Sequence, residues 1–138
     1  SLQQQVKLKD AFIKLTSNEG IGLILALTIM LETGEISRFQ QAGNYASYCR
    51  CVNGARYSNG KKKGASNTKN GNKYLAWAFV EAANFAIRYN ETVKKYYQRK
   101  LARTHMMVAK KTVAHKLARA CFYVLRDNVE FDVNKAFG

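Results

Sequence analysis

The segment from Ser58 to Lys73, SNGKKKGASNTKNGNK, gathers side chains that suit phosphate chemistry. It carries five lysines, several amides and glycines, and no acid. A hydroxyl such as that of Ser58 can attack a phosphodiester if nearby cations stabilise the charge on phosphorus and a base removes the proton. These residue types predict a loop that closes over a phosphate. A solvated linker has a similar composition, so that alternative stays open.

The residues of this segment divide into two predicted roles. Ser58 is the candidate nucleophile, although no base stands beside it in the sequence and an ordinary polar loop serine is the plainer interpretation. Cations would neutralise phosphate charge, and an Asn-Gly pair would let the loop fold back around a phosphate. The predicted nucleic-acid contacts here are Arg56, Asn59, Gly60, Lys61, Lys62, Lys63, Lys69 and Lys73.

A second candidate phosphate site is the stretch EGIGLILA, which begins at Glu19. Gly20 and Gly22 allow a tight turn and a close backbone approach. The free N–H groups of the helix that follows could then face a DNA phosphate without reading sequence. This spacing predicts a helix-hairpin-helix with Gly20 and Gly22 as nucleic-acid contacts. A simple helical hairpin with a glycine turn is the alternative.

The charge distribution indicates the class of partner. The net charge is +14, and residues 36–80 and 92–126 contain no Asp or Glu but hold eight and ten of the 23 basic residues, respectively. Such a field repels itself unless a polyanion neutralises it, so DNA or RNA is the leading partner. An acidic protein is the alternative. A membrane surface is disfavoured, because no helix pairs a strongly basic face with an exposed apolar one.

Other enzyme classes lack their motifs here. There is no Walker motif, no His-x-Glu and no Gly-x-Ser-x-Gly. The nine acids are scattered, and none makes a convincing pair for two-metal catalysis. His105 and His115 are expected on helix surfaces. We therefore expect no metal site and no cofactor in this chain.

The cysteines fit a reducing cytoplasm, the expected location. Cys49, Cys51 and Cys121 are odd in number and lack a disulfide-framework spacing. A zinc site is disfavoured because the usual Cys-x2–4-Cys pair is missing. Cys121 is expected in the core.

The elements that must position these residues are predicted to be helices. The chain has no proline, which leaves long helices uninterrupted. The longest apolar run, Ile21 to Leu31, is shorter than the ~20 residues of a membrane span and reads as a buried helix. A turn is expected at Thr16–Gly22 and an irregular segment at Val52–Gly71. Helices are expected at Ser1–Lys14, Ile21–Leu31, Gln40–Cys49, Asn72–Tyr89, Glu91–Arg103 and Met107–Arg126.

The last long helix is expected to have two faces. Val113, Leu117, Cys121 and Val124 recur on one face, and a basic stripe of Lys111, His115, Arg119 and Arg126 lies opposite. The stripe could track phosphates or be merely solvated. The tail beyond it is expected to pack through Phe131 and Phe137.

The order of these pieces resembles a known family. EGIGLILALTIMLETGEISRF, YASYCRCV, RYSNGKKKGASNTKNGNKYLAWAFVEAANFAIRYN and VAHKLARACFYVLRD follow one another along the chain. This order is similar to the C-terminal domain of insertion-sequence transposases of the one-ten, one-sixteen and nine-oh-two type. The resemblance covers about Leu15 to Asp132. Its most specific parts are the Gly-Ile-Gly stretch and the Gly-Asn-x-x-Leu that opens the long middle helix.

The resemblance implies one half of a two-part recombinase. An N-terminal RuvC-like domain would carry DEDD carboxylates that bind magnesium, and those carboxylates have no counterpart here. The C-terminal domain would supply a serine that links covalently to DNA. The family serine directly precedes a glycine, whereas Ser58 is followed by Asn59 and then Gly60. Ser58 is still assigned, because it is the only hydroxyl at that end of the loop besides Tyr57.

The sequence as a whole thus predicts an all-α domain with an embedded helix-hairpin-helix and a long basic Gly/Lys/Asn loop. Residues 1–14 are expected to end a connecting helix from an N-terminal domain outside this chain, and 15–138 to form the transposase domain. The resemblance implies DNA, a structured guide RNA and a homo-oligomer as partners. A non-catalytic helix-hairpin-helix module and a dimerisation domain are the alternatives.

Overall fold

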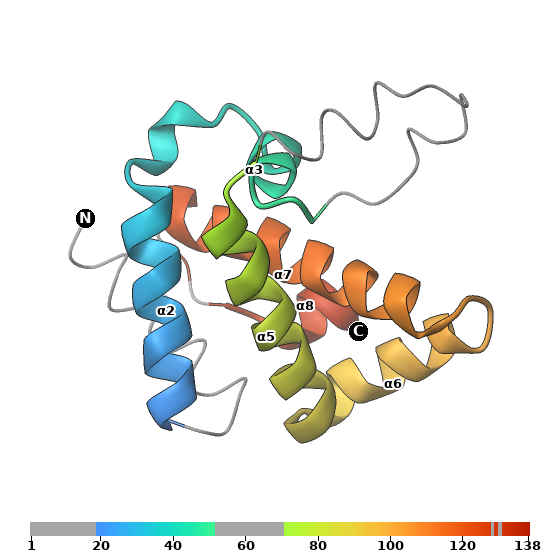
Figure 1. Ribbon diagram of the computed structural model, residues 1–138. Coiled ribbons are helices and arrows are strands. Elements are labelled where there is room, and N and C mark those ends of the chain that lie inside the picture. Colours follow the sequence, from blue (N-terminus) through green and yellow to red (C-terminus); the bar gives the residue numbers. More distant parts are fainter. Residues whose placement is uncertain (1–18, 52–70, 128, 130) are drawn as a thin grey trace, which may run out of the picture.

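The computed structural model describes residues 19–51, 71–127, 129 and 131–138, and within these ranges the chain is all-α. The elements are α2 (Glu19–Thr33), the 3-10 turn η1 (Ile36–Arg38), α3 (Ala42–Tyr48), α5 (Lys73–Tyr89), α6 (Glu91–Leu101), α7 (Met106–Asp127) and α8 (Val133–Phe137). Helix α5 packs between α2 and α7, while α3, α6 and α8 also contact α7 (Figure 1). The predicted all-α class is confirmed for the described residues. The leading helix predicted at Ser1–Lys14 lies outside the described residues.

The helix ends follow local chemistry. Asn72, Asn90 and Asp132 each stand just before a helix, and each side chain accepts a backbone N–H from the first turn. Helix α2 ends at Gly34, whose φ of +65° is readily adopted by glycine. The four predicted middle and late helices, α3, α5, α6 and α7, appear within two residues of their expected bounds. The short elements η1 and α8 were not predicted.

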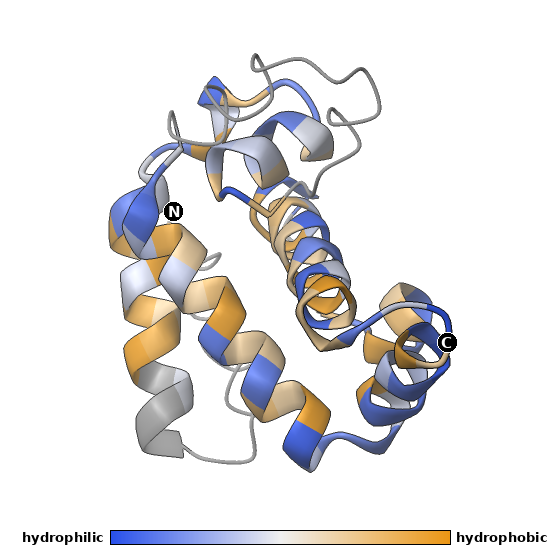
Figure 2. Ribbon diagram, turned by 45° about the vertical axis from the view of Figure 1, so that its right-hand side comes forward, coloured by the Kyte–Doolittle hydropathy of each residue, from blue (hydrophilic) through white to orange (hydrophobic). Residues whose placement is uncertain are grey.

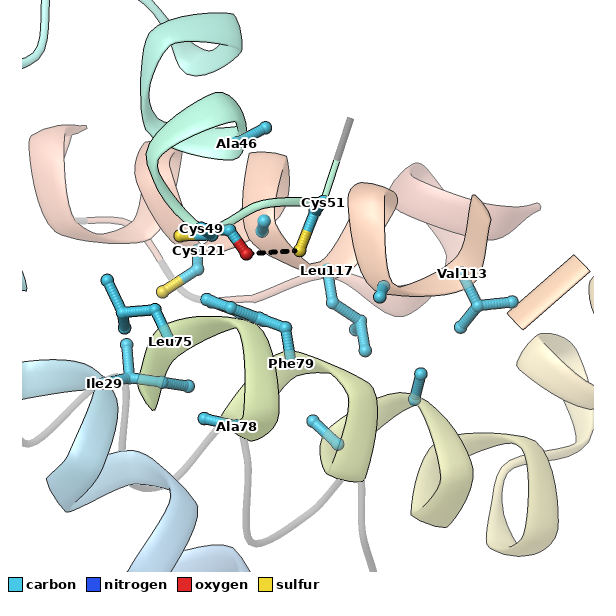
Figure 3. Packing of buried hydrophobic residues seen from close by; sticks show 14 of the residues in the cluster. Ile29, Ala46, Cys49, Cys51, Leu75, Ala78, Phe79, Val113, Leu117 and Cys121 are labelled. Carbon is cyan, nitrogen blue, oxygen red and sulfur yellow. Dashed lines mark hydrogen bonds between the residues drawn. The ribbon is translucent and has the colours of Figure 1, made fainter. Parts of the chain in front are cut away.

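Small side chains let the central helices approach closely. On α5, Ala78, Ala82, Ala83 and Ala86 are buried, and α7 contributes further buried alanines to the same core. Leu75 and Phe79 of α5 point into the space between α2, α3 and α7 (Figure 3). The resulting core holds α5 rigidly from its first turn.

The tail packs as predicted, and the cysteines join the core. Phe137 is buried and Phe131 packs against the core from a half-buried position. Cys49, Cys51 and Cys121 are all free and buried, and Figure 3 shows the three side chains beside the α3–α7 contact. Burial raises the pKa of the Cys51 thiol and of the Cys121 thiol to about 12 in each case. These thiols are therefore protonated and unreactive in the folded domain.

The two faces of α7 are as predicted with one exception. Val113, Leu117, Cys121 and Val124 are buried, and Lys111, Arg119 and Arg126 are exposed. His115 is instead half-buried, and its Nε2 has no hydrogen-bond partner. Burial, followed by the charges of Arg119 and Lys116, lowers the pKa of His115 below its ordinary value of 6.5. The surface position expected for His115 is therefore wrong, because α7 is covered from several sides rather than one. His105 is exposed, as expected.

Candidate nucleic-acid interface

The predicted site residues fall into two groups. Gly20, Gly22 and Lys73 lie in described helices. The others lie in residues 52–70, outside the described ranges: Ser58, Arg56, Asn59, Gly60, Lys61, Lys62, Lys63 and Lys69. Their predicted roles stay predictions, but the structure describes both ends of the segment that carries them.

The glycines of the proposed hairpin lie inside a helix rather than in a turn. Helix α2 begins at Glu19, so Gly20 is in its first turn and Gly22 follows, buried. The turn predicted at Thr16–Gly22 is therefore wrong from Glu19 onward. The apolar run extends the helix upstream because its packing outweighs the weak helix propensity of glycine, about 1 kcal/mol per residue. The partner helix of the hairpin lies outside the described residues.

The two ends of segment 52–70 meet at one place. The backbone N–H of Asn72 donates to the carbonyl of Tyr48 at 2.7 Å. Gly71 lies against Arg50 and Tyr48. We call Tyr48, Arg50, Cys51, Gly71 and Asn72 the loop stem. It fixes where the segment leaves and rejoins the helical core (Figure 1).

Asn72 is the hub of the stem. Its Oδ1 accepts the backbone N–H groups of Tyr74 and Leu75, each at 2.9 Å, and so caps α5. Its Nδ2 donates to Glu32 Oε1 at 2.9 Å and lies 3.4 Å from the hydroxyl of Tyr48. One side chain therefore joins α2, α3 and α5 at the base of the loop.

Gly71 is required by space rather than by backbone angle. A Cβ on Gly71 would lie 2.5 Å from Cγ of Arg50 and 2.6 Å from the Tyr48 carbonyl oxygen. Such distances are far inside van der Waals contact. Any larger residue would push apart the two chain segments of the stem, residues 48–51 and 71–72.

The first chain segment of the stem turns sharply into the core at Arg50 and Cys51. Arg50 has φ of 57°, a left-handed conformation that is uncommon for a residue other than glycine. The following N–H, of Cys51, donates to the carbonyl of Ala46 at 2.9 Å. The Cys51 thiol is buried and donates to the Cys49 carbonyl (Figure 3). The loop thus departs from a firmly anchored residue.

The surroundings of the stem are mainly cationic. The guanidinium of Arg38 lies 4.8 Å from the ring centres of both Phe39 and Tyr48. Hydrogen bonding to Asn72, then to Arg38, lowers the pKa of Tyr48 below its ordinary value of 10. Lys73 is exposed at the start of α5, as expected for a phosphate contact. An anion near the stem would therefore meet positive charge from Arg38 and Lys73.

A second basic region covers α6 and α7. Figure 2 shows α6 as largely hydrophilic, in contrast to the largely hydrophobic α2. Arg99, Lys100 and Lys116 place their charged groups 5.7, 5.5 and 5.3 Å from the ring centre of Tyr96. The sequence indicated positive charge here, but it did not indicate that two helices would bring three cations to one ring.

The described part of the chain has neither a cluster of metal ligands nor a helix that could span a membrane. Those residues contain no group of three or more His, Cys, Asp or Glu side chains that could hold a metal ion. None of the helices described is both long and apolar enough to cross a bilayer.

Sequence reasoning singled out the loop but assigned no role to its stem. Gly71 and Asn72 entered only as bounds of predicted segments and as part of a family motif, and Tyr48, Arg50 and Glu32 were not singled out. An asparagine before a helix is a usable sign of a cap. No local pattern indicates that Asn72 reaches Glu32, which lies 40 residues earlier in the chain.

Comparison with known proteins agrees with the motif order. The model of the family described as "Transposase IS116/IS110/IS902 family" matches residues 14–98, more than half of the chain. The match includes α2, the loop stem and α5, and it ends within α6. No curated protein and no solved structure matches the chain.

Proposed function

Because the chain belongs to the IS116/IS110/IS902 family of transposases, we propose that it is the C-terminal, DNA-binding domain of an insertion-sequence transposase. The loop of residues 52–70 grips the sugar-phosphate backbone, and Ser58 supplies the nucleophile for strand exchange. The observation that carries this proposal is the loop stem. It pins both ends of a lysine-rich segment to the helical core, next to the cations Arg38 and Lys73.

The chemistry follows from the residue types of the loop. The Ser58 Oγ forms a bond to phosphorus while the bond from phosphorus to a bridging sugar oxygen breaks. Lys61, Lys62 and Lys63 neutralise the charge that develops on the non-bridging oxygens. The hydroxyl proton passes to a base, and the leaving sugar oxygen takes up a proton.

A fixed stem serves this chemistry because position limits the rate of a displacement. A nucleophile must stand about 3–3.5 Å from phosphorus and in line with the leaving oxygen. A long loop with free ends loses more entropy on closing over a strand than one whose ends are already joined. Because the contacts of Asn72 and Gly71 join the ends when the domain folds, this entropy is lost during folding rather than during DNA binding.

Magnesium belongs elsewhere in this proposal. The resemblance implies metal-binding carboxylates, but no carboxylates of the described residues cluster in a way that fits a divalent ion. We therefore assign magnesium ligands to an N-terminal RuvC-like domain outside this chain. A structured guide RNA and a homo-oligomer are further parts of the proposal.

Duplex DNA binding as a function of salt tests the loop. Each phosphate contact contributes about 0.9 to the slope of log affinity against log salt. Replacing Lys61, Lys62 and Lys63 together by Ala should reduce that slope by up to about 2.7. Ser58→Ala should leave the slope unchanged but abolish strand exchange by the full-length transposase. An unchanged slope in the triple variant would show that the loop does not touch phosphates.

Arg88→Gln is the matched charge control. Arg88 lies at the far end of α5, 15 residues and about 22 Å of helix from Lys73. Its loss should change the slope much less than the loss of a loop lysine. If Arg88→Gln reduced the slope by a third of the effect of the triple lysine variant, the effect per charge would be equal, and net charge rather than the loop would govern DNA binding.

A dimerisation module is a second candidate function, and exposed apolar side chains favour it. On α2, Ile24, Leu27 and Leu31 form an exposed stripe, and Leu31 is 79% exposed. A helix that is apolar on every side is normally covered. If a second copy covers this stripe, Leu31→Lys will lower the sedimentation coefficient at high protein concentration. A concentration-independent monomer would exclude this function.

A further inference from the structure

A groove runs along α7 where the C-terminal tail folds back onto it. Its volume is about 660 Å³. Helix α7 contributes Lys116, Arg119 and Tyr123, and the tail contributes Phe131 and Lys135. We call this the α7–α8 groove. Its volume is within the range of about 300–1,000 Å³ that is usual for sites binding organic ligands.

The groove has cations without carboxylate partners. No carboxylate of the described residues forms an ion pair with Lys116, Arg119 or Lys135. Two acids also line the groove, but both are engaged. Asp127 is paired with Arg126, and Asp132 accepts the backbone N–H groups of Asn134 and Lys135. Lys116, Arg119 and Lys135 outnumber the two acids, so the lining keeps a net positive charge that favours an anionic ligand.

The groove also offers an aromatic wall. The ring of Tyr123 is 38% exposed, and Phe131 is half-buried beside it in the lining. Tyr123 packs edge-to-face on Phe122 at 5.4 Å, which restrains its orientation. An exposed, restrained ring next to cations that pair with no carboxylate of the described residues suits a ligand that is planar and apolar on one side and anionic on the other.

The positive charge does not stop at the groove. Lys116 lines it and also lies 5.3 Å from the centre of the Tyr96 ring, where Arg99 and Lys100 of α6 converge. The cations therefore continue from the groove onto α6. A ligand that used them all would carry several phosphates in a row, as a strand does and a nucleoside monophosphate does not.

We propose that the α7–α8 groove binds one unpaired nucleotide of a nucleic-acid strand. The base stacks against Tyr123 and Phe131, and the flanking phosphates lie on Lys116, Arg119 and Lys135. This inference rests on the proposed function, nucleic-acid binding, and deepens it. It gives the domain a second contact besides the loop, selective for single-stranded or bulged positions.

The test compares two labelled DNAs with the same number of base pairs. One is a perfect duplex, and the other carries a single unpaired 2-aminopurine as a bulge. We expect the chain to bind the bulged DNA more tightly, with quenching of 2-aminopurine fluorescence as the base stacks. Tyr123→Ala should reduce the affinity for bulged DNA by about fivefold or more, while duplex affinity stays within about twofold. Tyr123→Phe keeps the ring and should behave as the wild type. Lys116→Gln with Lys135→Gln should reduce the salt slope for bulged DNA.

Tyr89→Ala is the matched control. Tyr89 is similarly exposed, at 49%, and carries Arg88 over its ring just as Tyr123 carries Arg126. Its loss should not change the preference for the bulge. If Tyr89→Ala and Tyr123→Ala act alike, the groove is not the site.

The outcomes separate the two proposals. If the wild type binds neither DNA, the proposed function itself fails. If it binds both equally, or if the preference survives Tyr123→Ala and the lysine changes, only the groove proposal is overturned. Competition adds two further refuting results. Free AMP that competes as well as the bulged strand would make this a mononucleotide site, and polyglutamate that does so would make it a site for acidic protein.

Discussion

Removing the side chain of Asn72 should loosen the domain at the base of the loop. Asn72→Ala deletes the two accepted bonds that cap α5 and the donated bond to Glu32. A lost cap costs about 1 kcal/mol. A lost bond from an amide to a half-buried carboxylate costs a further 1–2 kcal/mol or so. The unfolding free energy should therefore fall by about 2–3 kcal/mol, or roughly 6–10 °C in Tm for a domain of this size.

Two further substitutions separate the cap from the bond to Glu32. Asn72→Ser keeps a capping oxygen but cannot donate to Glu32 at the same distance, so it should recover only about 1 kcal/mol of the loss. Asn72→Asp also caps, but it sets a second carboxylate against Glu32 and should be destabilised at neutral pH. Adding Glu32→Gln to Asn72→Asp removes the repulsion and should restore most of the stability.

Urea unfolding followed by far-ultraviolet circular dichroism gives these differences directly. If Asn72→Ala stayed within about 0.5 kcal/mol of the wild type, a change typical of an uninvolved surface site, Asn72 would not hold the stem. An Asn72→Asp variant as stable as the wild type at neutral pH would contradict the contact with Glu32. Duplex DNA affinity should also fall in Asn72→Ala, although Asn72 is not a proposed phosphate contact, because the stem keeps its backbone bond to Tyr48 but loses the side-chain contacts to Glu32 and Tyr48 that hold it firmly.

Three other predictions concern the stem and the core. Gly71→Ala should cost about 1–3 kcal/mol in thermal or urea unfolding, whereas Gly43→Ala, with no close atom nearer than 3.9 Å, should be neutral or slightly stabilising; equal effects would contradict the packing at the stem. Tyr45→Phe breaks the buried 2.6 Å hydrogen bond with Thr33 and should cost about 1–2 kcal/mol, and adding Thr33→Val should cost less than the sum of the single changes in a double-mutant cycle. Burial raises the pKa of the Cys121 thiol to about 12 from its ordinary value of 9.0. The contribution of the buried, protonated thiol to stability is therefore intact below pH 9 and is lost as pH rises from 9 towards 12. Iodoacetamide should label Cys121 no faster than the domain unfolds, and rapid labelling of the native protein would show that Cys121 is not buried.

Most of the fold was predictable because helices depend on neighbours in the sequence. A continuous apolar run predicted α2, and apolar residues at helical spacing predicted α5 and α7. The errors lie where packing decides. Thr16–Gly22 looked like a turn because of its glycines, yet α2 extends back to Glu19. Likewise, His115 looked exposed, yet it is half-buried.

The candidate site also has residues that could be predicted from the sequence and contacts that could not. The lysines and Ser58 could be singled out from the sequence alone, since charge and residue type need no structure. The stem could not be predicted, because Asn72 reaches Glu32 across 40 residues. The α7–α8 groove could not be predicted either, because it needs Tyr123 of α7 and Phe131 of the tail in one lining.

By itself, then, the sequence determined the helical class, the positions of the main helices and the cationic character of the chain, since each follows from spacing or composition within a short window. Only the tertiary structure decided which cations lie together, where the ends of the loop are anchored and which aromatic rings stay exposed. Those features arise when α2, α3, α5, α7 and the tail pack against one another. Contacts between residues far apart in the chain leave no periodic trace in the sequence, so they emerge only when the core closes.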